Sequence, residues 1–361
     1  MLLLMACNHQ QKEPVTTPWG QVLDSVSQNE TFDLYEIQAN GELIVATVSG
    51  PLTYYDYRGR SLGTQYMLCQ RLASRLGVSL RVELCRDSTE MANKLASGHV
   101  DIVAWPTPGK IEVCKGKPLL ENELKAWYKD SILAEVKREE AFLLSTHSVK
   151  RRVFSPMLDK KGGIVSHYDH LFVRYSRPIR WDWRLMAAQC YQESTFDPKA
   201  TSWAGAKGLM QIMPATADHL GLPRDKIYDP EQNISAAARY LGELERKFTD
   251  IGDRNERTNF VLASYNGGIH HVRDAMALAE RDGHNPRCWR EVSAYVLKLS
   301  DPRYYNDPIV KNGYMRGSET VDYVASIRER HRGYLGVRTP HVGAPNRHPR
   351  KSDNRKKKYD V

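Results

Sequence analysis

Residues 191–198 read Tyr-Gln-Glu-Ser-Thr-Phe-Asp-Pro, and residues 205–214 read Gly-Ala-Lys-Gly-Leu-Met-Gln-Ile-Met-Pro. The first stretch ends a predicted helix on which Met186, Cys190 and Glu193 stand at i, i+4 and i+7, and therefore on one face. That face is apolar until it reaches the carboxyl group of Glu193. Because burial disfavours the charged form of a carboxyl group, it favours the protonated state that a general acid needs.

Two other interpretations of the carboxyl groups stay open from the residues alone. Judged on its helix, Glu193 is also compatible with an exposed side chain at a fraying helix end, or with a structural carboxyl group. Asp197 is the obvious second carboxylate for glycoside hydrolysis, which usually needs two. However, Asp197 precedes Pro198, which disfavours helical geometry there, so we expect its side chain to point away from that of Glu193.

The chain from residue 179 to residue 336 carries helical signals throughout. Asp182 is a capping residue ahead of the Glu193 helix, and Asp229 followed by Pro230 is a strong helix start. Further helices are predicted at residues 258–265, 269–281, 289–299 and 319–332. Since no strand pattern interrupts them, this region predicts an all-α domain.

Before residue 145, predicted strands alternate with predicted helices. The strands are expected at residues 43–48, 78–84 and 100–105, and the helices between them at residues 64–76 and 88–96. This βαβαβ order predicts a parallel sheet in an α/β lobe over residues 41–144, so the whole chain is expected to be an α+β protein of two domains. A charged helical stretch at residues 119–137 follows the strands, and residues 145–178 are expected to form a junction.

The net charge of +9 is concentrated at the C-terminus. The tail over residues 337–361 holds eight lysines and arginines against two aspartates, so it carries six of the nine charges. The remainder is too weakly basic for a nucleic-acid-binding surface, and no nucleic-acid partner is expected. We expect a disordered, solvated tail, with contact to anionic wall polymer or lipid headgroups as the alternative.

The first seven residues, Met-Leu-Leu-Leu-Met-Ala-Cys, form an apolar run that ends in Leu-x-Ala-Cys. This pattern resembles the lipobox of bacterial lipoproteins, in which the cysteine is acylated and becomes the N-terminus. The resemblance implies a lipid anchor on Cys7. Residues 8–40 are polar and have few structure signals, so they predict a tether. Asn8 favours the outer membrane, with the protein facing the periplasm. A chance apolar start is the alternative, and no other segment reaches 18 apolar residues.

The other cysteines carry no metal-binding pattern. They are Cys69, Cys85, Cys114, Cys190 and Cys288, and none forms a C-x-x-C pair or stands at ligand spacing from a histidine. No metal is therefore expected. No other cofactor is expected either. A Cys69–Cys85 disulfide stays open, because the sequence does not reveal the distance between the two thiols.

Four ordered motifs in the helical region resemble those of the soluble lytic transglycosylase fold, which is related to goose-type lysozyme. They lie at residues 192–200, 205–214, 263–268 and 319–324. The N-terminal lobe resembles one lobe of a periplasmic solute-binding domain, on residues 41–47, 51–55 and 98–104. This order of domains is similar to that of the membrane-bound lytic murein transglycosylase F family. No second set of strands follows Trp105, so a structural lobe is favoured over a two-lobed ligand sensor.

The resemblance implies a role for each residue at a matching motif position. Glu193 would be the sole catalytic acid and base. Ser202 would touch the substrate near the reacting sugar, and the two motif tyrosines would bind sugar and steady Glu193. The implied substrate-binding residues are Ser202, Met210, Gln211, Tyr265, Asn266 and Tyr323.

By this resemblance, the substrate is the glycan strand of peptidoglycan and the reaction is lytic transglycosylation in cell-wall remodelling. One carboxyl group suffices if the C6 hydroxyl of N-acetylmuramic acid attacks its own C1, because the nucleophile then belongs to the substrate. The product would be a 1,6-anhydro sugar. Two alternatives stay open: a lysozyme-type hydrolase with a positioned water, and a wall-binding or sensory lipoprotein with a lapsed active site. No motif identifies a wall-remodelling protein as a partner.

Overall fold

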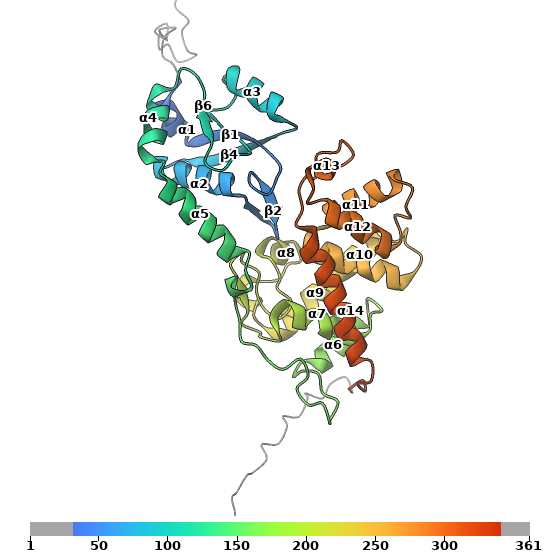
Figure 1. The fold of residues 1–361 in the computed structure, drawn as a ribbon. Helices are drawn as coiled ribbons and strands as arrows, with labels where there is room; N and C mark the ends of the chain where they lie inside the picture. The colour runs from blue at the N-terminus through green and yellow to red at the C-terminus, as the bar shows by residue number, and fades with distance from the viewer. Residues whose placement is uncertain (1–31, 341–361) are drawn as a thin grey trace, which may run out of the picture.

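The computed structural model describes residues 32–340, which form an α/β lobe followed by a helical domain (Figure 1). The described chain begins at the far end of the lobe and ends at the opposite end of the helical domain (Figure 1). Cys7, most of the expected tether and residues 341–361 of the basic tail lie outside the described residues.

The lobe is built on a four-stranded sheet in the order β4-β1-β5-β6. Strand β1 (Glu42–Val48) pairs in parallel with β4 (Ser79–Cys85) and with β5 (Ile102–Ala104), and β6 (Ile111–Val113) runs antiparallel to β5. The register along β1 and β4 runs from Glu42 opposite Ser79 to Val48 opposite Cys85. The predicted parallel βαβαβ unit is therefore confirmed, with β6 as an added edge strand.

Both faces of this sheet are covered, as parallel strands require. Leu43 and Val45 of β1 join a buried cluster with helices on one face, whereas Ala46 joins a second cluster on the other face. The first face is covered by α1 (Leu34–Asn40), α2 (Thr64–Leu76) and α4 (Pro118–Trp127), and the second by α3 (Ser88–Ala96). The burial of β1 on both sides explains its continuous apolar sequence.

Three features of the lobe differ from expectation. Residues 34–40, expected to be part of a tether, form α1, because Asp33 and Glu36 make a capping box and Ile37 packs in the core. The charged stretch at 119–137 splits into α4 and α5 (Asp130–Leu143), and α5 leads towards the helical domain (Figure 1). A hairpin of β2 (Tyr55–Tyr57) and β3 (Arg60–Leu62) was not predicted.

The helical domain packs around α7 (Trp183–Ser194), which carries Glu193. Met186, Ala187, Ala188 and Cys190 are fully buried there, and α7 packs against α6 and α14. The other helices are α6 (Asp169–Ser176), α8 (Pro214–His219), α9 (Pro230–Lys247), α10 (Arg254–Gly267), α11 (Ile269–Arg281), α12 (Trp289–Lys298), α13 (Pro302–Tyr305) and α14 (Gly317–Tyr334). Short 3-10 helices η1 (Thr146–Ser148) and η2 (Arg224–Lys226) complete it.

The predicted helix starts in this domain are confirmed by their hydrogen bonds. Asp182 accepts from the main-chain N–H of Arg184, and Asp229 accepts from that of Gln232 with Pro230 as the first helical residue. These side-chain oxygens satisfy main-chain donors that have no partner within the first turn of a helix. The local capping signals were therefore sufficient to place these two helices.

The edges of the helical domain differ from the predicted ones. Helix α6 lies inside the expected junction, yet its Phe172 is fully buried in the helical core. Strand β7 (Val149–Lys150) of the junction pairs antiparallel with β8 (Thr201–Ser202), so the domain is not purely helical. At the other end, Thr339 accepts a hydrogen bond of 3.2 Å from the indole of Trp183, so the tail begins later than residue 337.

The structure also answers the question of the cysteines. Cys69, Cys85, Cys114, Cys190 and Cys288 are all free thiols, so the Cys69–Cys85 disulfide is not formed. Between residues 32 and 340, no group of three or more His, Cys, Asp or Glu side chains is placed to hold a metal ion. Within the same range, no helix has the length and apolar character needed to cross a membrane.

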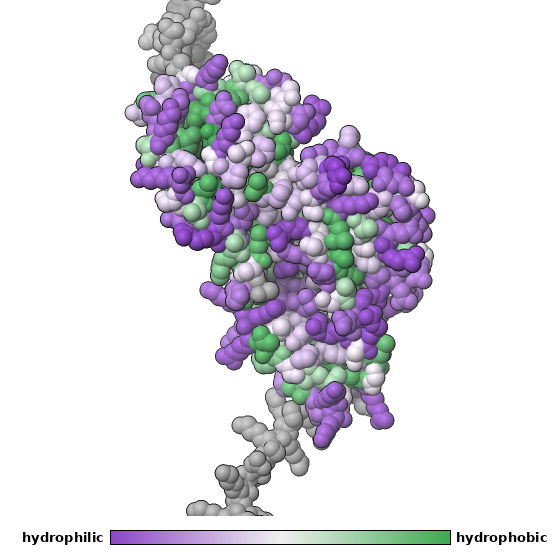
Figure 2. Space-filling view, viewed as in Figure 1, coloured by the Kyte–Doolittle hydropathy of each residue, from purple (hydrophilic) through white to green (hydrophobic). Residues whose placement is uncertain are grey.

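The two domains are in direct contact, and Figure 2 shows them as two adjoining masses. The main-chain N–H of Tyr314 donates to Ser49 Oγ, just beyond the end of β1, at 2.9 Å. The ring of Tyr314 packs edge-on against Tyr55 of the lobe, with ring centroids 5.1 Å apart, and against Tyr305. The carboxyl end of β1 therefore rests on the helical domain. In open α/β sheets, ligands usually bind at the carboxyl ends of the parallel strands.

Candidate active site

Glu193 lies in the last turn of α7, just before the chain turns sharply. Thr195 and Phe196 both adopt the left-handed conformation, with φ of 53° and 63°. Two consecutive non-glycine residues in this region cost on the order of 1–3 kcal/mol each, and such strain is concentrated at functional sites. The turn is held by the N–H of Thr195, which donates to the carbonyl of Tyr191 at 2.8 Å. It ends the helix so that Glu193 faces a cleft.

The carboxyl group of Glu193 is positioned by Tyr323 of α14. Tyr323 Oη donates to Glu193 Oε1 at 2.6 Å, and Gln189 Nε2 donates to Tyr323 Oη at 3.2 Å. Tyr323 is buried, so its hydroxyl has little freedom to turn towards water. This chain from Gln189 through Tyr323 orients one oxygen of Glu193 and leaves the other available to a substrate.

Burial raises the pKa of the half-buried Glu193, as the apolar helix face predicts. The positive charge of Arg58, the hydrogen bond from Tyr323 and the charge of Arg151 act in the opposite direction, but burial dominates. A raised pKa keeps the carboxyl group protonated to higher pH, as a general acid requires. The opposing groups also stabilise the carboxylate once the proton has been given away.

The loop at residues 205–214 is shaped by its contact with Asn233. Gly208 has a φ of +80°, and a Cβ at this position would collide with the side chain of Asn233. Asn233 Oδ1 accepts from the N–H of Met210 at 2.8 Å, and the following residue, Gln211, adopts a φ of 47°. The glycine and the asparagine together hold Gln211 at the cleft.

Met210 does not line the cleft, contrary to the sequence-based expectation. Its side chain is fully buried in the helical core, and only its main chain takes part in the site. The carbonyl of Met210 accepts a hydrogen bond of 2.7 Å from Tyr265 Oη. Packing explains the difference, because the side chain of Met210 is part of the helical core, whereas that of the next residue, Gln211, lines both cavities.

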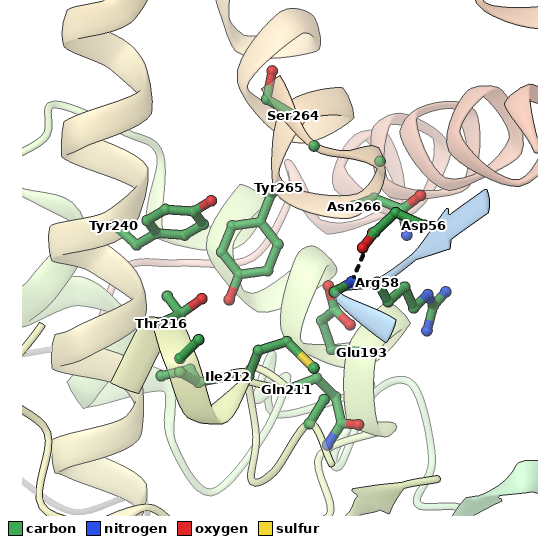
Figure 3. A pocket seen from close by; sticks show the side chains of 16 residues that line it. Asp56, Arg58, Glu193, Gln211, Ile212, Thr216, Tyr240, Ser264, Tyr265 and Asn266 are labelled. Carbon is green, nitrogen blue, oxygen red and sulfur yellow. Dashed lines mark hydrogen bonds between the residues drawn. The ribbon is translucent and has the colours of Figure 1, made fainter. Parts of the chain in front are cut away.

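Two cavities meet at Glu193. The first, of about 240 Å³, is lined by Tyr265, Tyr240 and the start of α8 (Figure 3), and the second, of about 320 Å³, by Ser202, Trp203 and Tyr323. Four residues line both cavities: Arg58, Glu193, Gln211 and Asn266. Because Glu193 lies where the cavities join, a chain-like substrate that occupies both would present the linking bond to its carboxyl group.

The remaining predicted residues reach this cleft through different contacts. Ser202 Oγ accepts from the N–H of Ala206 at 3.0 Å, and Asn266 Oδ1 accepts from Thr320 Oγ1 at 2.8 Å. Tyr265 does not bond to Glu193, since its hydroxyl is used by the carbonyl of Met210. Of the predicted substrate-binding residues, all but Met210 line a cavity.

Asp197 is not available as a second catalytic carboxylate. Its oxygens accept from the main-chain N–H of Arg152 at 2.6 Å and of Lys199 at 3.0 Å. Its side chain therefore ties the junction to the turn after α7, in agreement with the expectation that it points elsewhere. Among the described residues that line the two cavities, the carboxyl groups besides Glu193 are those of Asp56, Glu319 and Asp322.

Several residues of the site were missed by sequence reasoning. Asp56, Tyr57, Arg58 and Gly59 come from the β2–β3 hairpin of the lobe, and Arg151 comes from the junction. Arg151 Nη1 donates to the main-chain carbonyl of Glu193 at 3.1 Å. No local pattern marks these residues as functional, although the Arg58-Gly59 pair between two short strands is a weak hairpin signal.

Comparison with known proteins places this site within a described family domain. Residues 171–286 match the family model described as the transglycosylase SLT domain. The matched segment begins in α6 and contains Glu193 and four of the predicted substrate-binding residues that line a cavity: Ser202, Gln211, Tyr265 and Asn266. The resemblance drawn from the motifs is thereby confirmed over this segment.

Three curated relatives carry the name membrane-bound lytic murein transglycosylase F. The one from Maricaulis maris is 41% identical over 162 residues, covering 45% of this chain and 35% of that protein. The one from Yersinia pestis (strain Pestoides F) is 41% identical over 165 residues, covering 46% and 33%. The one from Desulfosudis oleivorans is 44% identical over 147 residues, covering 41% and 32%. The alignments span about a third of the length of these relatives.

Two solved structures align with different parts of the chain. The 70 kDa soluble lytic transglycosylase of Escherichia coli is 27% identical, with a TM-score of 0.34, and the alignment covers 46% of this chain and 24% of that one. The arginine-bound form of domain 1 from TmArgBP is 20% identical, with a TM-score of 0.23, and covers 28% of this chain and 97% of that one.

Proposed function

We propose that this protein is a lytic transglycosylase, which cleaves the β-1,4 bond between N-acetylmuramic acid and N-acetylglucosamine in peptidoglycan. The observation that carries the proposal is Glu193, a half-buried carboxyl group with a raised pKa that lies where two cavities join. The match of residues 171–286 to the SLT domain supports the substrate class. The reaction needs no metal or cofactor.

The proposed reaction uses Glu193 twice. Its carboxyl group first protonates the glycosidic oxygen, so that N-acetylglucosamine leaves and positive charge develops at C1 of N-acetylmuramic acid. The resulting carboxylate then accepts the proton of the C6 hydroxyl, whose oxygen forms the bond to C1. The proton that was given is returned, no water is consumed, and the product is a 1,6-anhydro sugar. Intramolecular attack supplies the advantage of proximity.

The surrounding residues support the two protonation states of Glu193. The hydrogen bond from Tyr323 is strongest to the carboxylate, so it favours the state in which Glu193 acts as the base. Gln211 and Asn266 line both cavities. Gln211 Nε2 already donates to the carbonyls of Ala200 and Gly208, and Asn266 Oδ1 accepts from Thr320, so Gln211 Oε1 and Asn266 Nδ2 are the amide atoms for sugar hydroxyl and acetamido groups. We assign sugar binding to them and to Ser202, whereas Tyr265 acts by holding the main chain of Met210.

Replacing Tyr323 by Phe is expected to shift the pH dependence of the reaction. Without the hydroxyl the carboxylate of Glu193 loses a hydrogen bond, so its pKa rises further. The alkaline limb of kcat/KM, which reports loss of the acid proton, should move to higher pH. The rate at the optimum should fall about tenfold, because the Glu193 carboxylate that acts as the base is no longer stabilised by this hydrogen bond. Tyr265→Phe is the matched control and should leave the alkaline limb in place, since that hydroxyl bonds to Met210.

Digestion of purified sacculi tests the proposal most directly. Mass spectrometry should find 1,6-anhydro-N-acetylmuramic acid at the new chain ends. Reducing N-acetylmuramic acid in its place would identify a lysozyme-type hydrolase, for which the exposed Asp322 at the second cavity is the available second carboxylate. Absence of both products would favour a wall-binding protein without activity.

We also propose that the protein is anchored by a lipid on Cys7 to the outer membrane and faces the periplasm. The lipobox-like sequence supports this, and the relatives are named as membrane-bound. Replacing Cys7 by Ser should move the protein from the membrane fraction to the soluble fraction. If the variant stays with outer membranes after a wash in high salt, an anchor on Cys7 is wrong.

A further inference from the structure

The tip of the β2–β3 hairpin brings an arginine to the active site. Arg58 and Gly59 form the two-residue turn, with φ of 52° and 69°, between the paired residues Tyr57 and Arg60. Such a turn needs positive φ at both positions and is usually made by Asn-Gly or Asp-Gly. An arginine in the first position is conformationally unfavourable, and residues kept in such conformations are concentrated at functional sites.

The hairpin is fixed to the helical domain on both sides of this turn. Tyr57 Oη donates to Glu319 Oε2 at 2.7 Å, and its ring lies parallel to that of Trp203, with centroids 6.2 Å apart. Arg60 Nε donates to the carbonyl of Ala204 at 3.1 Å. The turn between them is thus held in place by contacts with the catalytic domain, and it forms part of the wall of the cleft.

The guanidinium of Arg58 has no hydrogen bond or ion pair with any residue in the described part of the chain. It lies over the ring of neighbouring Tyr57, 5.4 Å from the ring centroid. Arg58 lies beside Glu193 in the first cavity (Figure 3) and also lines the second. By contrast, the guanidinium of Arg151 donates a hydrogen bond to the main-chain carbonyl of Glu193, and that of Arg316 donates to the carboxylate of Glu319. A guanidinium carries five donors, so Arg58 is available to an anionic group of a ligand.

We propose that Arg58 is a substrate-binding residue that holds a carboxylate of the peptide attached to the lactyl group of N-acetylmuramic acid. The inference rests on the proposed function. The sugar rings of the glycan carry no charge, so the peptide carboxylates are the groups that a planar guanidinium fork would recognise. The N-terminal lobe would thereby select glycan that still bears its peptides.

The second cavity is the favoured side for this carboxylate. Arg151 also lines that cavity and adds positive charge, while Glu319 is already engaged by Tyr57 and Arg316. Asp322 is exposed at the same cavity and partly opposes an anion there. The first cavity is lined by Arg58 and Asp56, and no second arginine among the described residues lines it.

Binding to the full chain with Glu193→Gln, which should not turn over substrate, tests the inference. The probes are the disaccharide N-acetylglucosaminyl-N-acetylmuramic acid with a tetrapeptide and the same disaccharide without peptide, measured by calorimetry. Adding Arg58→Asn should weaken binding of the peptide-bearing probe about tenfold, the usual effect of losing a charge-assisted hydrogen bond. Binding of the bare disaccharide should change less than about twofold.

Two controls separate recognition from folding and from net charge. Asn adopts the left-handed conformation readily, so Arg58→Asn should keep or raise the melting temperature. Arg58→Lys should retain part of the preference for the peptide-bearing probe, because lysine keeps the positive charge but lacks the planar guanidinium. Arg86→Ala, which removes an 88% exposed side chain elsewhere on the lobe, should change neither affinity.

Equal weakening for both probes would overturn the inference, since Arg58 would then contact the sugar or shape the cleft. Tighter binding and faster lysis by Arg58→Asn would overturn it as well, because the hairpin would be an obstruction. If the wild type lyses sacculi but shows no preference for the peptide-bearing probe, the role of Arg58 is rejected and the proposed function stands. Peptide preference without any lysis would support Arg58 and reject the proposed function.

Discussion

Replacing Glu193 by Gln is expected to lower lysis of sacculi on the order of 10²–10⁴-fold, the usual contribution of a general acid and base. Gln has nearly the same shape, and its amide oxygen still accepts the hydrogen bond from Tyr323. The variant therefore loses the proton that Glu193 transfers, but it keeps the shape of the side chain and the hydrogen bond from Tyr323. Turbidity of a sacculus suspension measures the rate, and release of anhydro products confirms the reaction.

The same variant should be more stable than the wild type at neutral pH. A carboxyl group whose pKa is higher in the folded state than in the unfolded state costs stability once it is ionised. The gain in melting temperature should be present above the folded pKa of Glu193 and should vanish below about pH 4, near the unfolded pKa. Equal activity of Glu193→Gln and wild type would show that lysis never depended on this carboxyl group.

Replacing Gly317 by Ala is expected to destabilise the protein by about 2 kcal/mol or more. Gly317 is the first residue of α14, and a Cβ there would collide with the main-chain carbonyl of Val296 in α12. Main chain cannot move aside as a flexible side chain can, so α14 would have to shift. Because α14 carries Tyr323, activity should fall together with the melting temperature.

Gly333→Ala provides the matched control in the same helix. A Cβ at Gly333 meets no atom within 4 Å, so the substitution should cost nothing in packing. It should instead stabilise the helix by about 0.5–1 kcal/mol, because Gly loses more conformational freedom on folding than Ala does. Similar losses of melting temperature for both variants would show that the close contact of α14 with α12 is not the cause.

Much of the secondary structure could be read from local patterns. Strand β1, helix α2 and helix α3 lie within a residue of their predicted positions. Strand β1 is a continuous apolar run, and the two helices have apolar periodicity bounded by Gly77 after α2 and by the Asp87 cap before α3. The hairpin β2–β3 and helix α6 were missed. Their segments are short, and contacts with the helical domain support both.

The chemistry of Glu193 was accessible from the sequence, since the apolar helix face and the motif that follows are neighbours along the chain. Its partner Tyr323 was accessible only by resemblance, because the two residues are separated by 130 positions. Arg58 and Arg151 could not be found at all. An arginine in a turn has no local feature that distinguishes a solvent-exposed side chain from one in a cleft.

The sequence by itself determined most of the helices and strands, the α/β lobe ahead of the helical domain, and the carboxyl group around which the site is built. These properties depend on residues within a few positions of one another. The tertiary structure alone decided that the lobe rests on the helical domain and that its hairpin brings Arg58 beside Glu193. It also placed Met210 in the core, since only packing between distant segments decides which side of a loop is buried.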